Sequence, residues 1–298
     1  MGVFDINGMQ IQSVYDLNGL LLTDAYDKNG NVIYIRQTSQ VDYTNYSFSQ
    51  KWPSKGISYS QGFDIYDGKV FWVSKSGDST IPSSCYVWNL SDGSQALSSA
   101  YVTIQSGHGN NLAFAYPKVY ASPAYPPSRV YVNIVSNDFL TFTLEKTLTF
   151  NDGTADLDCC LDENDSTIMW TIGHISGAST TWIVSKWDLT SLTDNGDGTF
   201  TPALLQTATT AQPESNRYFQ GIRHHDGMLW YASGNGAQRA YIYAINPNNG
   251  DVLYSIDLET NTEPEGLAWL RDTEVIGGYA LYVGFQGMML RKYTFEAL

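Results

Sequence analysis

The chain has 298 residues, which is long enough to bury a large core, and its net charge is −14. Such an acidic chain argues against a nucleic acid ligand, because phosphate contacts need clustered Lys and Arg. Tyr (21), Trp (8) and Gly (26) are plentiful while only 15% of the residues are charged. This composition is typical of packed β-sheets joined by tight turns and argues against a mainly helical or disordered chain.

Residues 1–36 carry a repeat with a period of 11 residues, in which an Asp stands two positions before each Asn-Gly pair. The pairs are Asn7-Gly8, Asn18-Gly19 and Asn29-Gly30. Asn-Gly is the strongest short signal for a hairpin turn, so we expect a ladder of β-turns here, outside a main fold at residues 37–298. A calcium loop is the alternative, but these segments lack the further oxygen ligands and the distal Glu of such a site.

Cysteine content and hydropathy limit the chemistry and the location. Cys85, Cys159 and Cys160 have no zinc spacing and form no disulfide framework, so we expect three buried small apolar residues and no metal or cofactor. The chain opens with no charged, apolar and cleavable leader, and no apolar run reaches the length of a membrane span. We therefore expect neither a signal peptide nor a membrane-spanning segment.

Two distant segments have matching sequences. Residues 59–74 read YSQGFDIYDGKVFWVS, and residues 218–233 read YFQGIRHHDGMLWYAS. Each copy has an Asp-Gly pair between two apolar runs, which predicts a β-hairpin with a two-residue turn. A hairpin that recurs at long spacing in an all-β chain indicates radial repetition, and therefore a β-propeller.

The strand pattern from residue 57 onward divides into five blades. They are predicted at residues 57–104, 111–150, 155–209, 218–258 and 266–295. The last blade lacks an outer strand, and we expect residues 41–52 to supply it and so close the ring. A sixth blade is the alternative, and residues 111–150, where PPS at 126–128 interrupts the pattern, are the only place for its extra hairpin.

Polar residues stand at the start of the predicted innermost strands, which should otherwise be apolar. We expect them to converge at one mouth of the central channel and to bind a polyhydroxylated ligand, because together they donate and accept many hydrogen bonds. The alternative is that they bond one another and backbone groups around the axis. The predicted ligand-binding residues are Gln61, His108, Asn111, Asp156, Gln220, Arg223 and Glu265.

Catalysis is a second possibility for the same channel. Asp156, Asp158, Glu263 and Glu265 could supply a carboxylate pair for glycoside hydrolysis. These acids cluster on two predicted blades, whereas five-bladed glycosidases take three acids from three blades. His224 and His225 are adjacent on a predicted hairpin and should point apart, which does not suit a metal site. We therefore expect binding without catalysis.

Aromatic residues near loops or strand starts offer a further indication of a sugar ligand, because exposed rings act as rigid stacking platforms. Most aromatic residues of such a chain must nevertheless pack between blades. The candidates for exposed platforms are Trp52, Tyr59, Tyr116, Tyr120, Tyr125 and Tyr218.

Two short resemblances bear on function. Gln61-Gly62, Gln220-Gly221 and the stretch EPEG at 263–266 resemble strand starts of the helveticin-type bacteriocin propellers. The repeats of residues 5–31 are similar to the N-terminal leaders of structural proteins from phages of gut Firmicutes. These resemblances imply a virion-associated or extracellular module, such as part of a phage tail, that recognises a cell-surface glycan or related polymer. Residues 1–36 would then attach it to other virion proteins. A scaffold that makes only protein contacts is the third alternative.

Overall fold

The computed structural model describes residues 24–26, 32–35, 41–74, 82–123, 128–175, 181–211 and 219–297. Several features predicted from the sequence lie outside these residues: the first two Asn-Gly pairs, the Asn29-Gly30 turn itself, Tyr125, Tyr218 and most of the segment 126–128. No helix in the described part of the chain is long and apolar enough to cross a membrane.

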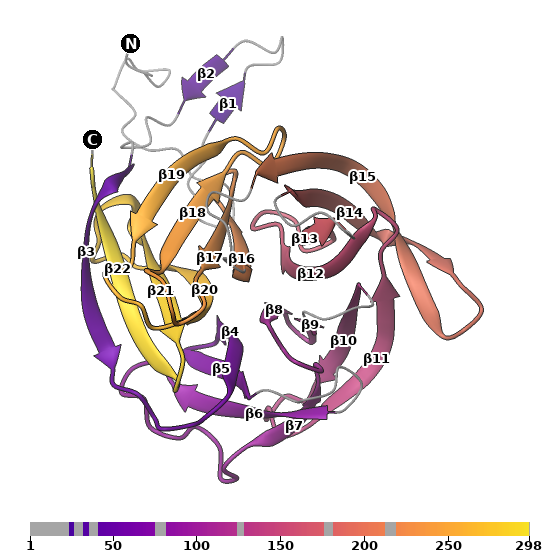
Figure 1. The fold of residues 1–298 in the computed structure, drawn as a ribbon, viewed down its shortest axis with the longest axis horizontal. Helices are drawn as coiled ribbons and strands as arrows, with labels where there is room; N and C mark the ends of the chain where they lie inside the picture. Colours follow the sequence, from indigo (N-terminus) through magenta and orange to yellow (C-terminus); the bar gives the residue numbers. More distant parts are fainter. Residues whose placement is uncertain are drawn as a thin grey trace, which may run out of the picture.

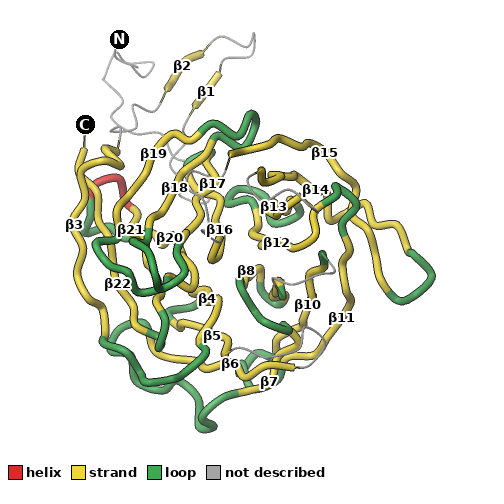
Figure 2. The backbone as a smooth tube through the Cα atoms, viewed as in Figure 1, coloured by secondary structure: helices red, strands yellow, loops and turns green. Residues whose placement is uncertain are grey.

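The fold is all-β, as predicted, and its sheets are arranged radially around a common centre (Figure 1). Strands make up most of the trace, and loops join their ends (Figure 2). Set one consists of β4 (Ser60–Tyr66), β5 (Lys69–Ser74), β6 (Pro82–Asn89) and β7 (Val102–Gln105). Set four consists of β16 (Phe219–His225), β17 (Met228–Ser233), β18 (Tyr241–Ile245) and β19 (Val252–Asp257). Within each set, neighbouring strands pair antiparallel in chain order.

Two further sets of four strands join into one eight-stranded sheet. Set two consists of β8 (Asn111–Ala115), β9 (Lys118–Ser122), β10 (Arg129–Val135) and β11 (Phe142–Thr149). Set three consists of β12 (Thr154–Leu161), β13 (Ile168–Ile175), β14 (Thr181–Asp194) and β15 (Thr199–Ala211). A short parallel pairing of the outer strands β11 and β15 connects them. Strand β9, which follows β8 after a tight Tyr116-Pro117 turn, is missing from the strands predicted from the sequence.

Set five is completed by the strand that precedes all the others in the main fold. It consists of β20 (Pro264–Arg271), β21 (Tyr279–Phe285), β22 (Met289–Ala297) and β3 (Val41–Trp52), with a short 3-10 helix η1 (Ile276–Gly278) before β21. Strand β3 pairs antiparallel with β22, and the Trp52 indole donates to the Met288 carbonyl at 3.2 Å. The predicted pairing of residues 41–52 with residues 289–295 is therefore confirmed.

Residues 24–26 and 32–35 form a separate two-stranded antiparallel hairpin, β1 (Asp24–Tyr26) and β2 (Val32–Ile35). Its strands flank the third Asn-Gly pair, so the hairpin predicted at this pair is present.

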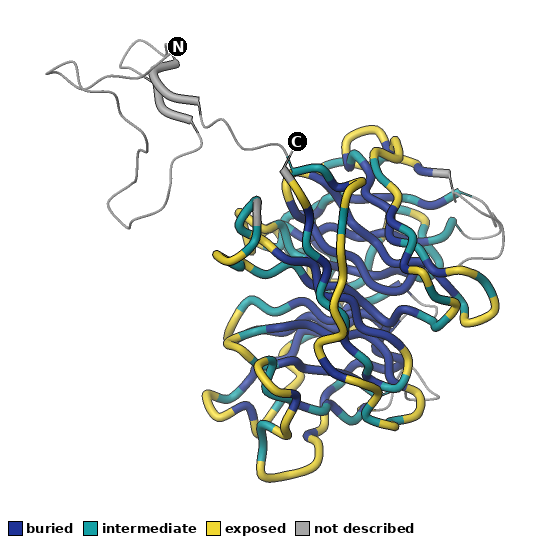
Figure 3. Tube along the Cα trace, turned by 90° about the vertical axis from the view of Figure 1, so that its left-hand side faces the viewer, coloured by how far each residue is buried: buried dark blue, intermediate teal, exposed yellow. Residues whose placement is uncertain are grey.

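The core lies between neighbouring sets rather than at the centre. Each of the buried apolar clusters combines residues of two consecutive sets, and one cluster joins set five to set one through Trp72, Phe63, Ala268 and Leu290. The inner and middle strands are mostly buried, whereas outer strands such as β3, β11 and β19 are exposed over much of their length (Figure 3). The cysteines are free and fully buried, as predicted.

Candidate functional site

The first strand of each set lies nearest the centre in Figure 1, and we call β4, β8, β12, β16 and β20 the inner strands. Six of the predicted ligand-binding residues lie on inner strands, and His108 lies in the loop before β8. Strands β4, β12, β16 and β20 each carry a register shift near their first residues. Such β-bulges bend a strand and redirect the side chains beside them.

The two sequence-matched hairpins have the same register. Ser60 pairs with Ser74, and Phe219 pairs with Ser233, and each pairing is followed by a bulge that contains a Gln-Gly pair. Both turns have the positive φ values of a type I′ hairpin, 49° and 67° in the first and 54° and 70° in the second. The predicted equivalence of Gly62 and Gly221 holds for register but not for φ, since Gly221 has a φ of 85° and Gly62 has no positive φ.

These glycines allow the inner strands to approach each other closely. The Gly62 amide donates to the Gly109 carbonyl at 2.8 Å, and a Cβ added to Gly62 would lie 2.5 Å from the Asn110 backbone. A Cβ added to Gly221 would lie 2.8 Å from the Cα of Gly266. At Gly62 and Gly221, backbone therefore packs directly against backbone, which only a residue without a Cβ permits.

Arg223 is buried, and its guanidinium bonds three inner strands. Nη1 donates to the Asn111 Oδ1 at 3.1 Å and to the Ile222 carbonyl at 2.7 Å. Nη2 donates to the Phe63 carbonyl at 2.9 Å and forms an ion pair with Asp64 at 2.9 Å. The sequence analysis did not single out Asp64, whose partner comes from a distant strand.

Asn111 and Asp64 extend this arrangement to further backbone groups. The Asn111 amide donates to the Cys159 carbonyl at 2.7 Å and to the Ile222 carbonyl at 3.1 Å. Asp64 accepts from the amides of Ile65 at 2.7 Å and Phe114 at 2.8 Å. We call Asp64, Asn111 and Arg223 the axial network. Its polar atoms form hydrogen bonds and an ion pair within the protein, and these contacts connect sets one to four.

Asp158 lies beside the axial network and is fully buried. Its carboxylate accepts from the Gly221 amide at 2.8 Å, the Ser122 hydroxyl at 3.0 Å and the Asn110 amide at 3.5 Å. Burial raises the pKa of Asp158 to about 7, although these hydrogen bonds oppose the shift. An enclosed carboxyl group with these partners cannot touch a ligand directly.

Three predicted residues lie at the starts of the inner strands. Gln61 donates to the Ser60 carbonyl at 2.9 Å, and Gln220 donates to the Glu263 carboxylate at 2.7 Å. Glu265 is buried on β20, two residues beyond Glu263. We call this end of the inner strands the mouth. His108, in the loop before β8, is also buried.

Tyr59 lies at the edge of an open hollow at the mouth. Its side chain is 68% exposed, and its φ of 58° is in a region that residues other than glycine rarely adopt. The Gly287 amide donates to the Ser60 hydroxyl at 2.8 Å, and the Gln286 amide donates to the Glu263 carbonyl at 2.9 Å. The hollow has a volume of about 450 Å³ and is lined by Gly56, Ile57, Ser58, Tyr59, Gln286 and Gly287.

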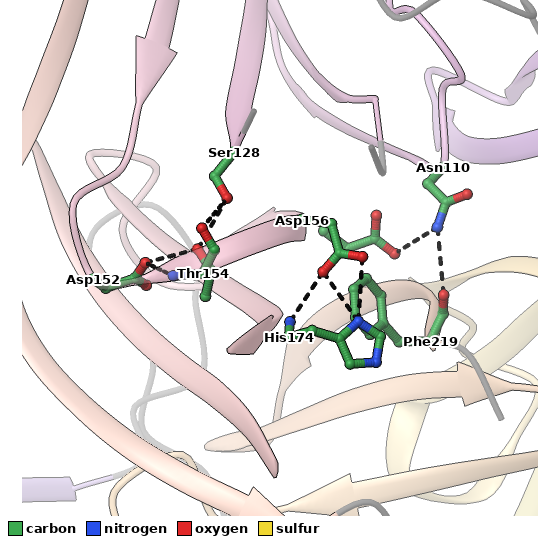
Figure 4. Close-up of polar contacts among 8 residues, drawn as sticks. Asn110, Ser128, Asp152, Thr154, Asp156, His174 and Phe219 are labelled. Atoms are coloured by element: carbon green, nitrogen blue, oxygen red, sulfur yellow. Dashed lines mark hydrogen bonds and ion pairs between the residues drawn. The ribbon is translucent and has the colours of Figure 1, made fainter. Parts of the chain in front are cut away.

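Asp156 binds a histidine that the sequence analysis did not consider (Figure 4). Its carboxylate accepts from Nδ1 of His174 at 3.0 Å and from the His174 amide at 3.1 Å. The imidazole packs against Phe219, with ring centroids 5.1 Å apart, and meets Trp182 edge-on at 5.5 Å. Asp156 and His174 are paired across β12 and β13, so the strand register was the signal that could have identified this pair.

His224 and His225 lie at the other end of β16 and point apart, as predicted. His224 stacks on Trp170 of set three, and its pKa is lowered by burial. His225 stacks on Trp269 of set five and binds Glu163 at 2.8 Å. Among the described residues, no group of three His, Cys, Asp or Glu is placed to hold a metal ion.

The aromatic candidates have different environments. Trp52 and Tyr120 are 3% and 7% exposed, so the expectation that they form exposed platforms is wrong, because both pack between sets. Tyr116 is partly exposed and stacks on Tyr66. Tyr59 is the most exposed aromatic residue in the described part of the chain.

Comparisons with known proteins give matches among solved structures. No protein-family model and no curated protein matches the sequence. The chain is similar to the tail fiber of Staphylococcus aureus phage P68, with a TM-score of 0.48 and 13% identity over 85% of this chain and 53% of that chain. It is also similar to an engineered GH43 glycoside hydrolase with endo-xylanase and exo-arabinofuranosidase activity, with a TM-score of 0.48 and 9% identity over 84% of this chain and 52% of that chain. The chain thus spans about half the length of each.

Proposed function

We propose that this protein is a five-bladed β-propeller that binds a bacterial surface glycan at the mouth. The five sets of four strands, and the apolar clusters between consecutive sets, support the blade count. The resemblance of residues 5–31 to phage leaders supports a virion-associated or extracellular location. In this proposal residues 1–36 attach the propeller to other virion proteins.

One observation carries the binding proposal: an exposed tyrosine with a strained backbone beside an open hollow. The positive φ of Tyr59 costs about 1 kcal/mol or more, which the neighbouring loop must offset. Such strain clusters at sites where it positions a side chain for a ligand. A sugar ring has an apolar face that stacks on a tyrosine, and its hydroxyl groups bond amides and carboxylates.

Hydrogen-bonding groups for such a sugar are close to Tyr59. Gln61 follows Tyr59 by two residues. On the other side of the hollow, the Gln286 amide donates to the Glu263 carbonyl, and the Glu263 carboxylate accepts a hydrogen bond from Gln220. In the proposed site these groups select the ligand, whereas Asn111 and Arg223 hold the inner strands together. Asp156, His108 and Glu265 are further members of the proposed mouth.

The test is a glycan array probed with the full chain and with Tyr59→Ala. We expect Tyr59→Ala to lose about tenfold or more in apparent affinity, because stacking on a tyrosine contributes most of the apolar contact. Tyr101→Ala is the matched control, since Tyr101 is also exposed (51%) but does not line the hollow. Equal binding by all three proteins, or no glycan bound by the wild type, would refute the proposal.

A reducing-sugar assay on each bound glycan separates binding from catalysis. Turnover that disappears in Asp156→Asn or Glu265→Gln while binding persists would make this a carbohydrate-active enzyme instead. Binding of proteins alone, with no glycan retained, would favour the scaffold.

A further inference from the structure

Four of the five outer strands carry a β-bulge, at which one residue has no partner on the neighbouring strand. The bulges occur where β11, β15, β19 and β3 each skip one residue in their pairing with β10, β14, β18 and β22. A bulge re-aims the side chains of its strand and can bring two consecutive residues to the surface. The skipped residues, all of them exposed, are Glu145, Leu205, Leu253 and Lys51.

The four bulges differ in charge. Sets two and five have the charged residues Glu145 and Lys51 there, and a charge on an exposed outer strand discourages association with another chain. Sets three and four have leucine instead. The exposed fractions are 44% and 52% for Leu204-Leu205, and 45% and 47% for Val252-Leu253. We call Leu204-Leu205 and Val252-Leu253 the rim patch, which lacks the charge that protects the other two bulges.

The two halves of the rim patch belong to neighbouring sets, three and four (Figure 1). The Gln206 amide donates to the Pro247 carbonyl at 3.1 Å, so the turn that leads into β19 lies against β15. None of the 13 residues of β15 is charged. Asp251, at the end of the turn, accepts a hydrogen bond from the Asn249 amide at 2.6 Å. The rim patch is therefore an apolar surface on a strongly acidic protein.

We propose that the rim patch joins two copies of this chain around a two-fold axis, with Leu204-Leu205 of each copy against Val252-Leu253 of the other. With a net charge of −14, two copies repel each other, so they can associate closely only where charge is absent. A two-fold contact also needs a surface that complements itself, and two apolar pairs of similar exposure on adjacent strands meet this requirement. A basic partner would instead be attracted to the acidic surface elsewhere.

The contact extends beyond the four residues of the rim patch. A stable dimer buries about 800 Å² on each copy, which is more than four side chains supply. We expect the exposed and uncharged Thr207 and Thr209 of β15 to contribute to the rest. The Tyr59 hollow is lined by segments next to sets one and five, so a contact through sets three and four leaves it open in both copies.

Sedimentation equilibrium of the full chain, from about 1 to 100 μM, measures the association. Wild type is compared with Leu205→Glu, Leu253→Lys and, as the matched control, Leu144→Glu. Leu144 is 45% exposed beside the bulge of set two and lies outside the rim patch. We expect the wild type and the control to dimerise alike. Each patch variant should dimerise at least about tenfold more weakly, because the contact would bury a charge without a partner.

A mixture of Leu205→Glu and Leu253→Lys tests the reciprocal contact. In the mixed dimer, one half of the contact pairs the new carboxylate with the new ammonium group. The other half keeps Leu253 of the first variant against Leu205 of the second. We therefore expect the mixture to dimerise more strongly than either variant alone. Unfolding of the variants cannot produce this recovery.

Three results would overturn the proposal. The first is a wild type that stays monomeric over the whole concentration range. The second is a loss of association in Leu144→Glu as large as in the patch variants, or no loss in either patch variant, because the association would then not depend on the rim patch. The third is a mixture that dimerises no better than its components, because the two halves of the rim patch would then not meet.

Discussion

The axial network and the mouth differ in how they use polar side chains. In the axial network, Arg223 bonds Asp64, Asn111 and two backbone carbonyls, and it is 9% exposed. At the mouth, Tyr59 is mostly exposed in a strained backbone conformation beside an open hollow. Polar residues thus hold the strands together in the axial network, whereas at the mouth an exposed side chain, that of Tyr59, lies beside the hollow.

This difference shows that a polar residue on an inner strand is not by itself a binding residue. Its partners decide its role, because a buried polar group must be bonded: the Arg223 guanidinium bonds three inner strands, whereas the Gln220 amide donates to the Glu263 carboxylate at the mouth. The two levels therefore predict opposite results of mutation: stability should depend on the axial network, and binding should depend on the mouth.

The largest effect is expected for Arg223→Ala. Removing the guanidinium leaves the buried Asp64 carboxylate without its counter-ion, which should lower the free energy of unfolding by about 3–5 kcal/mol. Chemical denaturation of the full chain measures this. Arg239→Ala is the control, because its ion pair with Asp257 is exposed and should contribute little. If Arg223→Ala is as stable as the wild type, the axial network does not stabilise the fold in the way that distinguishes it from the mouth.

Asp158 makes the stability of the interior depend on pH. Its pKa of about 7 in the folded protein lies above the unfolded value of 3.8, so the folded state binds the proton more tightly. The contribution of Asp158 to the free energy of unfolding should therefore be largest below pH 4. It should decrease, by a few kcal/mol at most, as the pH rises to about 7. In Asp158→Asn this fall should vanish, because the amide keeps the three hydrogen-bonding neighbours but does not ionise. Parallel pH profiles of the two proteins would contradict this.

The smallest effect on stability and a clear effect on binding are expected for Gln220→Ala. The lost hydrogen bond to Glu263 should lower the free energy of unfolding by no more than about 1.5 kcal/mol. Affinity for an array-identified glycan should fall about tenfold, measured by titration calorimetry. Gln95→Ala, which changes an exposed amide on a loop of set one, should leave affinity unchanged. A Gln220 variant that unfolds readily but binds normally would place Gln220 in the axial network.

Much of the fold could be predicted because its signals are local. Asp67-Gly68 and Asp226-Gly227 each fix a turn and the register of the hairpin around it, and the closing strand 41–52 was evident from a strand missing in the last set. The strand β9 was missed because the turn at Tyr116-Pro117, which joins it to β8, contains neither an Asn-Gly nor an Asp-Gly pair.

The site was harder to predict because its contacts join different sets. Whether Arg223 faces Asp64 or a ligand depends on how sets one and four pack, which no local pattern in either strand encodes. His174 was missed because its partner Asp156 lies on the neighbouring strand rather than in a recognisable motif. The mouth position of Gln61 and Gln220, by contrast, follows from the repeated hairpin.

The pairing of β3 with β22 has a consequence for synthesis on the ribosome. Trp52 and Met288, which are bonded in the closed ring, are 236 residues apart, so β3 emerges early and its partner emerges late. Until then, the unpaired edge of β3 can associate with other chains. Contacts of such long sequence separation also form slowly. We therefore expect the pairing of β3 with β22 to be a late step in the folding of the protein.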